Sequence, residues 1–281
     1  MQVLQNYDDN DKFTFGHSRS GIIEIDFHLH DGFEIFYLIS GDVNYFVEKK
    51  IYELKPGDLI ITNKYEIHKP YFKSDKVYER IIIQFSHEIP GLYSTGEFDL
   101  LNCFNNREKG ERNRIQLNHT QLDEMLELFN KIERTGRKTE HSDKILRDTY
   151  FVQLLVLLNK AFLPSRVNDG NTNIPVKISP ILDYINENLQ GDLSLEFIEQ
   201  RFFINKYYLS RLFKKNTGIN LHQYIIYKRL ARAKELLAQG VSVTDACYMT
   251  GFNDYSNFIR IFKKIIGVSP GLYRKMSVES V

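Results

Sequence analysis

The sequence is poor in cysteine and lacks any long apolar run, and each lack excludes a class of protein. Its two cysteines, Cys103 and Cys247, cannot build a disulfide scaffold, and they lie too far apart in sequence to suggest a metal knuckle. The most apolar stretch, 151–163, is interrupted by polar side chains and falls short of the roughly 18 residues of a membrane helix. Residues 1–11 lack the basic flank and apolar segment of a secretory signal, so we expect a cytoplasmic protein without a membrane segment.

Charge is distributed unevenly along the chain, although the net charge is only +1. Residues 1–174 carry a net charge of −5, and residues 175–281 carry a net charge of +6. The length of 281 residues suits two domains that each bury a core. A basic C-terminal domain suits nucleic acid because its cations displace counterions from phosphate; a solvated charged surface is the alternative.

The N-terminal part has the pattern of a β-barrel or a β-sandwich. Short runs of β-branched and aromatic residues are separated by turn pairs such as Asp31-Gly32 and Gly41-Asp42, which allow the chain to reverse. The predicted strands cover residues 22–29, 34–39, 43–47, 59–61 and 79–85.

Two helices are predicted after the strands, over 120–134 and 142–162, because apolar residues recur there at helical spacing. The second helix is apolar on nearly every face. We expect one face to pack on the barrel and another on a twin subunit; burial against the barrel alone is the alternative. A polar segment containing proline and glycine, Pro164–Asn173, predicts a linker. The predicted division is therefore 1–163, a linker over 164–177, and 178–281.

The C-terminal domain contains an internal repeat. At an offset of 49 residues, LSRLFKK at 209–215 aligns with FIRIFKK at 258–264, and Gly218 aligns with Gly267. The repeated unit is a short helix, a tight turn and a second helix that ends at glycine. An ordinary helical bundle is the alternative, but a doubled unit in a basic domain favours DNA binding.

The second helix of each unit has an apolar stripe and an opposite polar stripe. Asn205 and Asp254 are the predicted N-caps, so the residues just after them lie at the end that a recognition helix presents to base edges. Arginine there can pair with guanine through two hydrogen bonds, whereas lysine suits phosphate. The predicted phosphate contacts are Lys206, Lys214, Lys215, Lys263 and Lys264.

The motifs YLSRLFKK at 208–215, RL at 229–230, GF at 251–252 and FKK at 262–264 closely resemble the DNA-binding domain of AraC/XylS-type bacterial transcriptional regulators. The resemblance covers 178–275 and implies two helix-turn-helix units joined by a long helix over about 221–239, with the second helix of each unit in a major groove. By position it implies six base-facing residues: Tyr207, Ser210, Arg211, Ser256, Ile259 and Arg260. The sequence departs from the family pattern at Glu199 and Cys247, where smaller residues are usual.

The pattern Gly21-x6-His28-x-His30-x3-Glu34-x6-Gly41, followed by Gly57-x10-His68, resembles the two cupin motifs of a β-barrel and the effector domain of the same regulators. Strand alternation puts the first two histidines on one face. We expect no metal cofactor; a divalent metal held by His28, His30, Glu34 and His68 is the alternative. Aromatic faces beside polar groups favour an effector pocket instead. Its predicted residues are His28, His30, Glu34, Tyr37, Tyr45 and His68.

Together these features predict an α+β multidomain protein, with an N-terminal cupin-like β-barrel and following helices and a C-terminal all-α tandem helix-turn-helix domain. We expect a dimeric, effector-responsive transcription factor that is not an enzyme and that binds promoter DNA and a sugar or other small polar molecule. The resemblance alone implies activation and contact with RNA polymerase. The alternative is a cupin metalloenzyme with a helical accessory domain, which requires a bound metal with an open coordination position.

Overall fold

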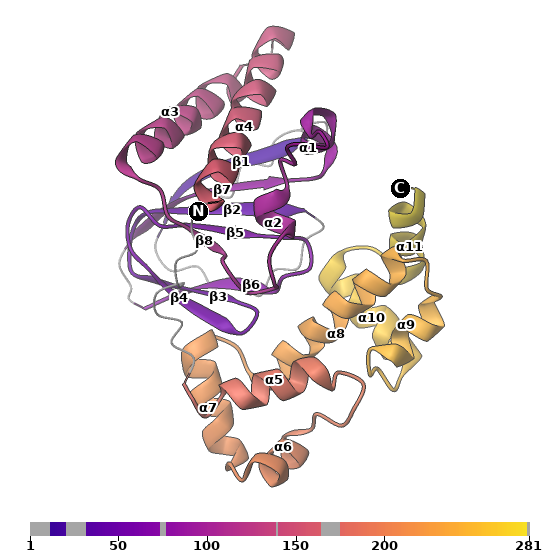
Figure 1. The fold of residues 1–281 in the computed structure, drawn as a ribbon. Helices are drawn as coiled ribbons and strands as arrows, with labels where there is room; N and C mark the ends of the chain where they lie inside the picture. The colour runs from indigo at the N-terminus through magenta and orange to yellow at the C-terminus, as the bar shows by residue number, and fades with distance from the viewer. Residues whose placement is uncertain (1–11, 21–31, 74–76, 139, 164–174, 280–281) are drawn as a thin grey trace.

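In a computed structural model of the chain, a helical pair lies at one end, two β-sheets lie in the middle and the C-terminal helices lie at the other end (Figure 1). The structure describes residues 12–20, 32–73, 77–138, 140–163 and 175–279. The predicted strand over 22–29 and the predicted linker segment Pro164–Asn173 fall wholly outside these ranges, so they stay predictions.

The described strands form two antiparallel sheets, one with the order β1-β7-β2-β5-β8 and the other with the order β4-β3-β6. Their bounds are β1 Phe13–Ser20, β2 Phe33–Ser40, β3 Val43–Val47, β4 Lys50–Leu54, β5 Leu59–Thr62, β6 His68–Phe72, β7 Tyr78–Phe85 and β8 Arg114–Ile115. The chain crosses from one sheet to the other after β2, β4, β5 and β6, so the two sheets face each other.

The predicted sheet-rich, cupin-like N-terminal domain is confirmed, but the described residues show no closed barrel. Within these residues no strand pairing joins the two sheets. Two of the crossings use glycines in the left-handed region, Gly41 at φ +123° and Gly57 at φ +95°, where other residues are strained. These turns send the chain to the opposite sheet instead of continuing one sheet around.

Alternation along β2 gives the five-stranded sheet two different faces. Phe33, Ile35 and Tyr37 pack in the core beneath the helical pair, whereas Phe36 and Leu38 pack in the core between the two sheets. The sheet therefore contributes to two cores, one on each side.

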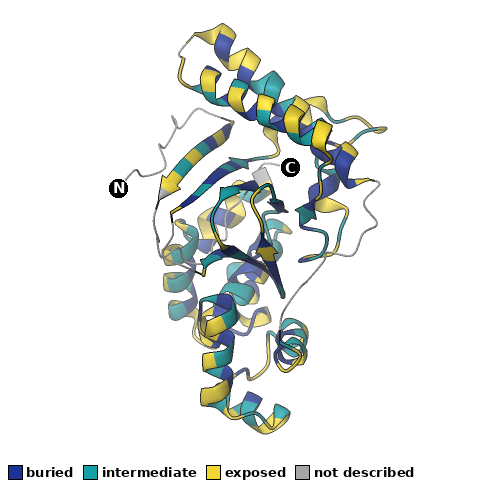
Figure 2. Ribbon diagram, turned by 90° about the vertical axis from the view of Figure 1, so that its left-hand side faces the viewer, coloured by how far each residue is buried: buried dark blue, intermediate teal, exposed yellow. Residues whose placement is uncertain are grey.

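The two predicted helices are confirmed as α3, His119–Gly136, and α4, His141–Phe162. Asn118 and Gln121 form a capping box that begins α3. Helix α3 buries one side on the five-stranded sheet and leaves the other side exposed (Figure 2). Helix α4 is mostly exposed or half-buried in its first half but is buried on most sides over 151–162. Two short helices, α1 over Glu88–Tyr93 and α2 over Asn102–Asn105, connect β7 to this layer.

The C-terminal domain contains the repeated unit twice. Its helices are α5 Ser179–Glu187, α6 Leu195–Phe202, α7 Lys206–Thr217, α8 Leu221–Ala238, α9 Val243–Met249, α10 Tyr255–Ile266 and α11 Pro270–Glu279. The first unit is α6 with α7 and the second is α9 with α10, and α8 joins them as predicted. One apolar core runs through the domain and also includes three residues of the N-terminal domain, Phe46, Ile51 and Ile67.

Candidate functional site

The start of α7 is fixed by two side chains that accept hydrogen bonds from its first free N–H groups. The Asn205 side-chain oxygen accepts from the backbone N–H groups of Tyr207 and Tyr208, both at 3.1 Å. The Glu199 carboxylate accepts from the backbone N–H of Lys206 at 3.1 Å. The N-cap prediction is therefore confirmed, and Glu199, which departs from the family pattern, serves as a further cap of the candidate recognition helix.

The start of α10 is built in the same way, because Asp254 accepts from the backbone N–H of Asn257 at 2.9 Å. Both helices end at a glycine in the left-handed region, Gly218 at φ +76° and Gly267 at φ +90°. The repeat found at an offset of 49 residues is thus a repeat of structure, down to the cap at each end.

Each of these helices turns its phenylalanines inward and its cations outward. Phe213 and Phe258 are fully buried, whereas Arg211 and Arg260 are exposed in the middle of their helices, each at the sixth position. The Arg260 guanidinium also donates to the side-chain oxygen of Asn257 at 2.7 Å, which orients it along the helix. The two arginines therefore occupy equivalent, solvent-facing positions in the two units.

The other predicted DNA contacts differ in exposure. Tyr207 and Ser256 are exposed, Ser210 is half-buried, and Ile259 packs partly against the domain core. Lys214, Lys215, Lys263 and Lys264 are exposed in the last turns. Lys206 instead pairs with Glu196 at 2.5 Å, and this hydrogen bond raises the pKa of Lys206. The roles of these residues on DNA stay predictions.

A second candidate site lies between the two sheets of the N-terminal domain. Glu34 accepts hydrogen bonds from the Tyr45 hydroxyl and the Gln84 amide, both at 2.8 Å, and lies 3.6 Å from Nε2 of His68. Glu34, Tyr45 and His68 are all buried, and the rings of Tyr45 and His68 are stacked. Arg80 is buried beside them and acts electrostatically on Tyr45. We call Glu34, Tyr45, His68, Arg80 and Gln84 the interior polar site.

Burial and the Glu34 carboxylate set the protonation states there. Burial raises the pKa of Tyr45 well above its ordinary value, and Glu34 adds to this, so the hydroxyl stays a neutral donor. Burial lowers the pKa of His68, but attraction to Glu34 and the hydrogen bonds to Glu34 and Glu66 outweigh it, so the net pKa is raised. His68 is therefore poised to carry a positive charge beside a carboxylate.

The backbone before His68 is anchored by a fully buried ion pair. Glu66 accepts from both terminal nitrogens of Arg107, at 2.6 and 2.5 Å, and from the backbone N–H of Gly110 at 2.7 Å. The Glu66 carbonyl accepts from Nδ1 of His68 at 2.9 Å, which leaves Nε2 facing Glu34. Burial raises the pKa of Glu66, but the hydrogen bonds and the attraction to Arg107 lower it by more. The net pKa is therefore lowered, and Glu66 is ionised.

The predicted effector residues are brought together only in part. Glu34, Tyr45 and His68 meet, but Tyr37 is wrongly placed by the prediction: three residues beyond Glu34 on β2, it faces the helical layer and packs on Phe129. His28 and His30 lie outside the described residues, so the alternative metal set is incomplete here. Arg80 and Gln84 were not predicted. They lie four residues apart on β7, so strand alternation puts them on the same face, which is the face that lines the interior polar site.

Two protein-family models match parts of the chain. Residues 23–155 match the AraC-like ligand binding domain, and residues 198–276 match a helix-turn-helix domain. The chain thus contains an AraC-like ligand-binding domain followed by a helix-turn-helix domain. It belongs to the AraC family. None of the helices in the described ranges is both long and apolar enough to span a membrane.

Relatives named HTH-type transcriptional activator RhaS, from Salmonella heidelberg and Citrobacter koseri, are 28% identical over 156 residues, which is 55% of this chain and 55% of theirs. The match thus spans about half the length of these relatives. Among solved structures, ToxT from Vibrio cholerae O395 is 16% identical over 96% of this chain and 99% of its own, with a TM-score of 0.37. A Listeria innocua protein is 36% identical over 37% of this chain and 98% of its own, with a TM-score of 0.35.

Proposed function

We propose that the chain is a sequence-specific transcription factor whose N-terminal domain controls promoter binding in response to a small molecule. The observation that carries this proposal is the duplicated recognition helix, α7 in the first unit and α10 in the second. Arg211 and Arg260 occupy the same register in two helices that are capped alike at both ends. Two such helices, joined rigidly by α8, can address successive major grooves on one face of DNA.

The test starts from promoter fragments selected by the full-length protein from a genomic library at physiological salt. We expect Arg260→Ala to weaken binding to the selected site by about 5- to 140-fold, the equivalent of a lost bidentate contact worth about 1–3 kcal/mol, and to relax specificity at one base pair. Lys264→Ala is the control, because losing a phosphate contact weakens binding equally on any sequence and flattens the salt dependence by about one unit. An equal loss on selected and random DNA for Arg260→Ala would contradict base reading.

The interior polar site supports a small polar effector, such as a sugar, because buried donors and acceptors lie there beside the rings of Tyr45 and Phe36. We propose that the protein is not an enzyme, because its relatives are named transcriptional activators. The metalloenzyme alternative requires a metal on His28, His30, Glu34 and His68. Stoichiometric metal in the purified protein, without promoter selectivity, would favour that alternative.

We also propose a homodimer formed through α4, in the cytoplasm. Ile145 and Leu146, in the first half of this helix, are 65% and 43% exposed, which is unusual for adjacent large apolar residues. Farther along, Val152 and Val156 are only partly buried. The proposals that the protein activates transcription and contacts RNA polymerase rest on the family and on the names of its relatives.

A further inference from the structure

The three-stranded sheet, β4-β3-β6, contacts a different part of the molecule on each face. On the inner face, Tyr45 of β3 and His68 of β6 belong to the interior polar site. On the outer face, Phe46 of β3 is part of the core of the DNA-binding domain. Neighbouring residues of a strand point to opposite faces and lie only about 3.3 Å apart along it. The interior polar site and the core of the DNA-binding domain are thus separated by the thickness of one sheet.

Strand β6 contacts the C-terminal end of α7, the candidate recognition helix of the first unit. Lys69 donates from Nζ to the carbonyl oxygen of Gly218, the C-cap of α7, at 3.3 Å. A Cβ atom added at Gly218 would lie 2.8 Å from the ring of Tyr71, so the cap itself is seated on that ring. At the equivalent glycine of the second unit, Gly267, an added Cβ would meet nothing within 4 Å. The docking is therefore particular to the first unit.

The turn between β3 and β4 holds the start of α8 next to this cap. Glu48, buried and at φ +55°, forms an ion pair with Lys228, and its carbonyl oxygen accepts from the Tyr224 hydroxyl at 3.3 Å. The ring of Phe46 meets the ring of Tyr224 edge to face, with centroids 6.0 Å apart. Next in the turn, Lys49 pairs with Asp183 of α5 at 2.9 Å. Three helices of the DNA-binding domain, α5, α7 and α8, are thus held by one sheet.

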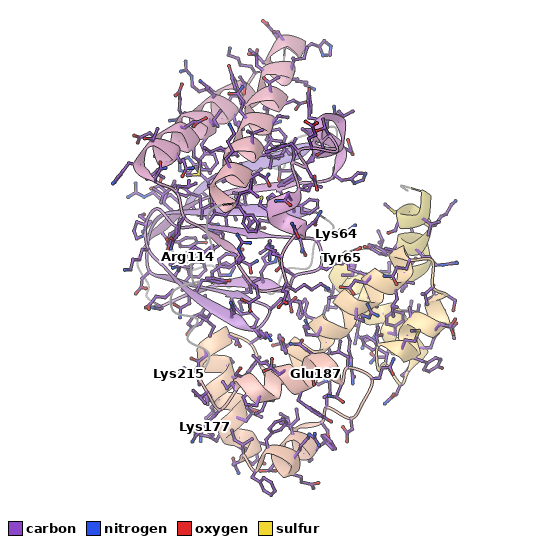
Figure 3. The ribbon with its side chains drawn as sticks, in the orientation of Figure 1. Lys64, Tyr65, Arg114, Lys177, Glu187 and Lys215 are labelled. Carbon is purple, nitrogen blue, oxygen red and sulfur yellow. The ribbon has the colours of Figure 1, made fainter. Side chains whose placement is uncertain are left out.

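A second set of contacts lies farther along α8, where Lys64 and Tyr65 face it (Figure 3). Lys234 donates to the carbonyl oxygen of Lys64 at 3.4 Å, and Glu235 forms an ion pair with Lys109, whose Nζ lies over the Tyr65 ring. This loop leads directly into Glu66 and β6. The same short stretch of chain, 64–71, therefore contacts α8, the interior polar site and the α7 cap.

We propose that β3 and β6 couple the interior polar site to the first helix-turn-helix unit, with Lys69 and Tyr71 as the residues that transmit a change at His68 to the end of α7. This inference rests on the proposed function and specifies how its effector site acts. A ligand that engages Glu34, Tyr45 or His68 shifts the balance between this docked arrangement and a looser one, because it binds the two differently. The second unit is connected to this route through α8.

The test is amide hydrogen exchange on the full-length protein, with neither DNA nor effector present. Tyr45→Phe removes the hydroxyl that donates to Glu34, and we expect exchange in 212–218 and 222–228 to become at least about threefold faster as the docking loosens. Tyr37→Phe is the matched control, since it is the same substitution on the opposite face of the neighbouring sheet. Unchanged exchange in Tyr45→Phe, or an equal effect of Tyr37→Phe, would overturn the coupling.

A second comparison separates coupling from general loosening of the domain. Tyr71→Ala, on the outer face, should speed exchange in the same two segments, and adding Tyr45→Phe to it should give little further change, because the connection is already broken. Independent, multiplicative effects would refute the proposed route. Promoter binding is measured separately, so a failure of DNA binding and a failure of the coupling give different results.

Discussion

The internal repeat supplies a matched pair of substitutions that measures how tightly the two domains dock. Gly218 and Gly267 end α7 and α10 at equivalent positions and share a left-handed backbone. Gly218→Ala and Gly267→Ala therefore cause similar backbone strain. They differ in what the new methyl group meets: the ring of Tyr71 at 2.8 Å in the first case, and nothing within 4 Å in the second.

The structure gives the expected size of the difference. An alanine in the left-handed region costs about 1–2 kcal/mol relative to glycine, and this is the whole cost expected for Gly267→Ala. Forcing a methyl group into an occupied space adds about 1–3 kcal/mol. Gly218→Ala should therefore lower the free energy of unfolding by about 2–5 kcal/mol. Part of this loss comes from a residue of the other domain.

The assay is urea denaturation of the full-length variants, followed by circular dichroism and, because the chain lacks tryptophan, by tyrosine fluorescence. Placing Gly218→Ala in a Tyr71→Ala background removes the obstructing ring, and the cost should then fall to that of Gly267→Ala. Equal costs for the two glycine substitutions, or no relief from Tyr71→Ala, would show that α7 does not dock on β6.

Three further predictions concern the N-terminal domain. Glu66→Gln should cost about 3–5 kcal/mol in urea denaturation, because Arg107 would stay buried without its carboxylate; a loss below about 1 kcal/mol would contradict this. Because Glu34 raises the pKa of His68 in the folded state, the stability that His68 adds relative to His68→Gln should be greatest below about pH 6.5 and be lost as the pH rises through the raised pKa; a pH-independent difference would refute it. Ile145→Glu should convert a dimer to monomers in sedimentation, and an unchanged dimer would rule out α4 as the interface.

The parts of the structure that depend on local chemistry could be predicted from the sequence. The caps at Asn205 and Asp254 were predicted because asparagine and aspartate accept from the first N–H groups of a helix wherever the helix lies. The two helices predicted over 120–134 and 142–162 are confirmed, because the spacing of apolar residues along the chain decides which residues a helix can bury. The repeat was visible because both copies meet the same requirements.

Features that depend on which strand lies beside which could not be predicted in the same way. β4 and β6 are short and contain lysine or histidine, and neither was predicted, because their polar residues are satisfied by partners distant in sequence: Lys50 by Glu111, His68 by Glu34 and Lys69 by the Gly218 carbonyl. Tyr37 was assigned to the effector pocket because it is an aromatic residue with a hydroxyl group. It lies an odd number of residues from Glu34 on the same strand, so it points to the opposite face of the sheet. Composition says which residues suit a pocket, and only strand register says which of them meet.

The linking helix α8 shows why the docked arrangement suits a switch. Tyr224, Lys228 and Glu235 recur on one side of it, and each has a partner in the N-terminal domain, whereas a helix considered alone would be expected to solvate its charges. Removing one member of such a pair leaves its partner buried and uncompensated, so a single substitution is costly. Undocking is different, because it returns both members to water together, and their net contribution to the docked state is then small. The polar pairs of this interface thus hold the first helix-turn-helix unit in place and add little to the cost of opening it.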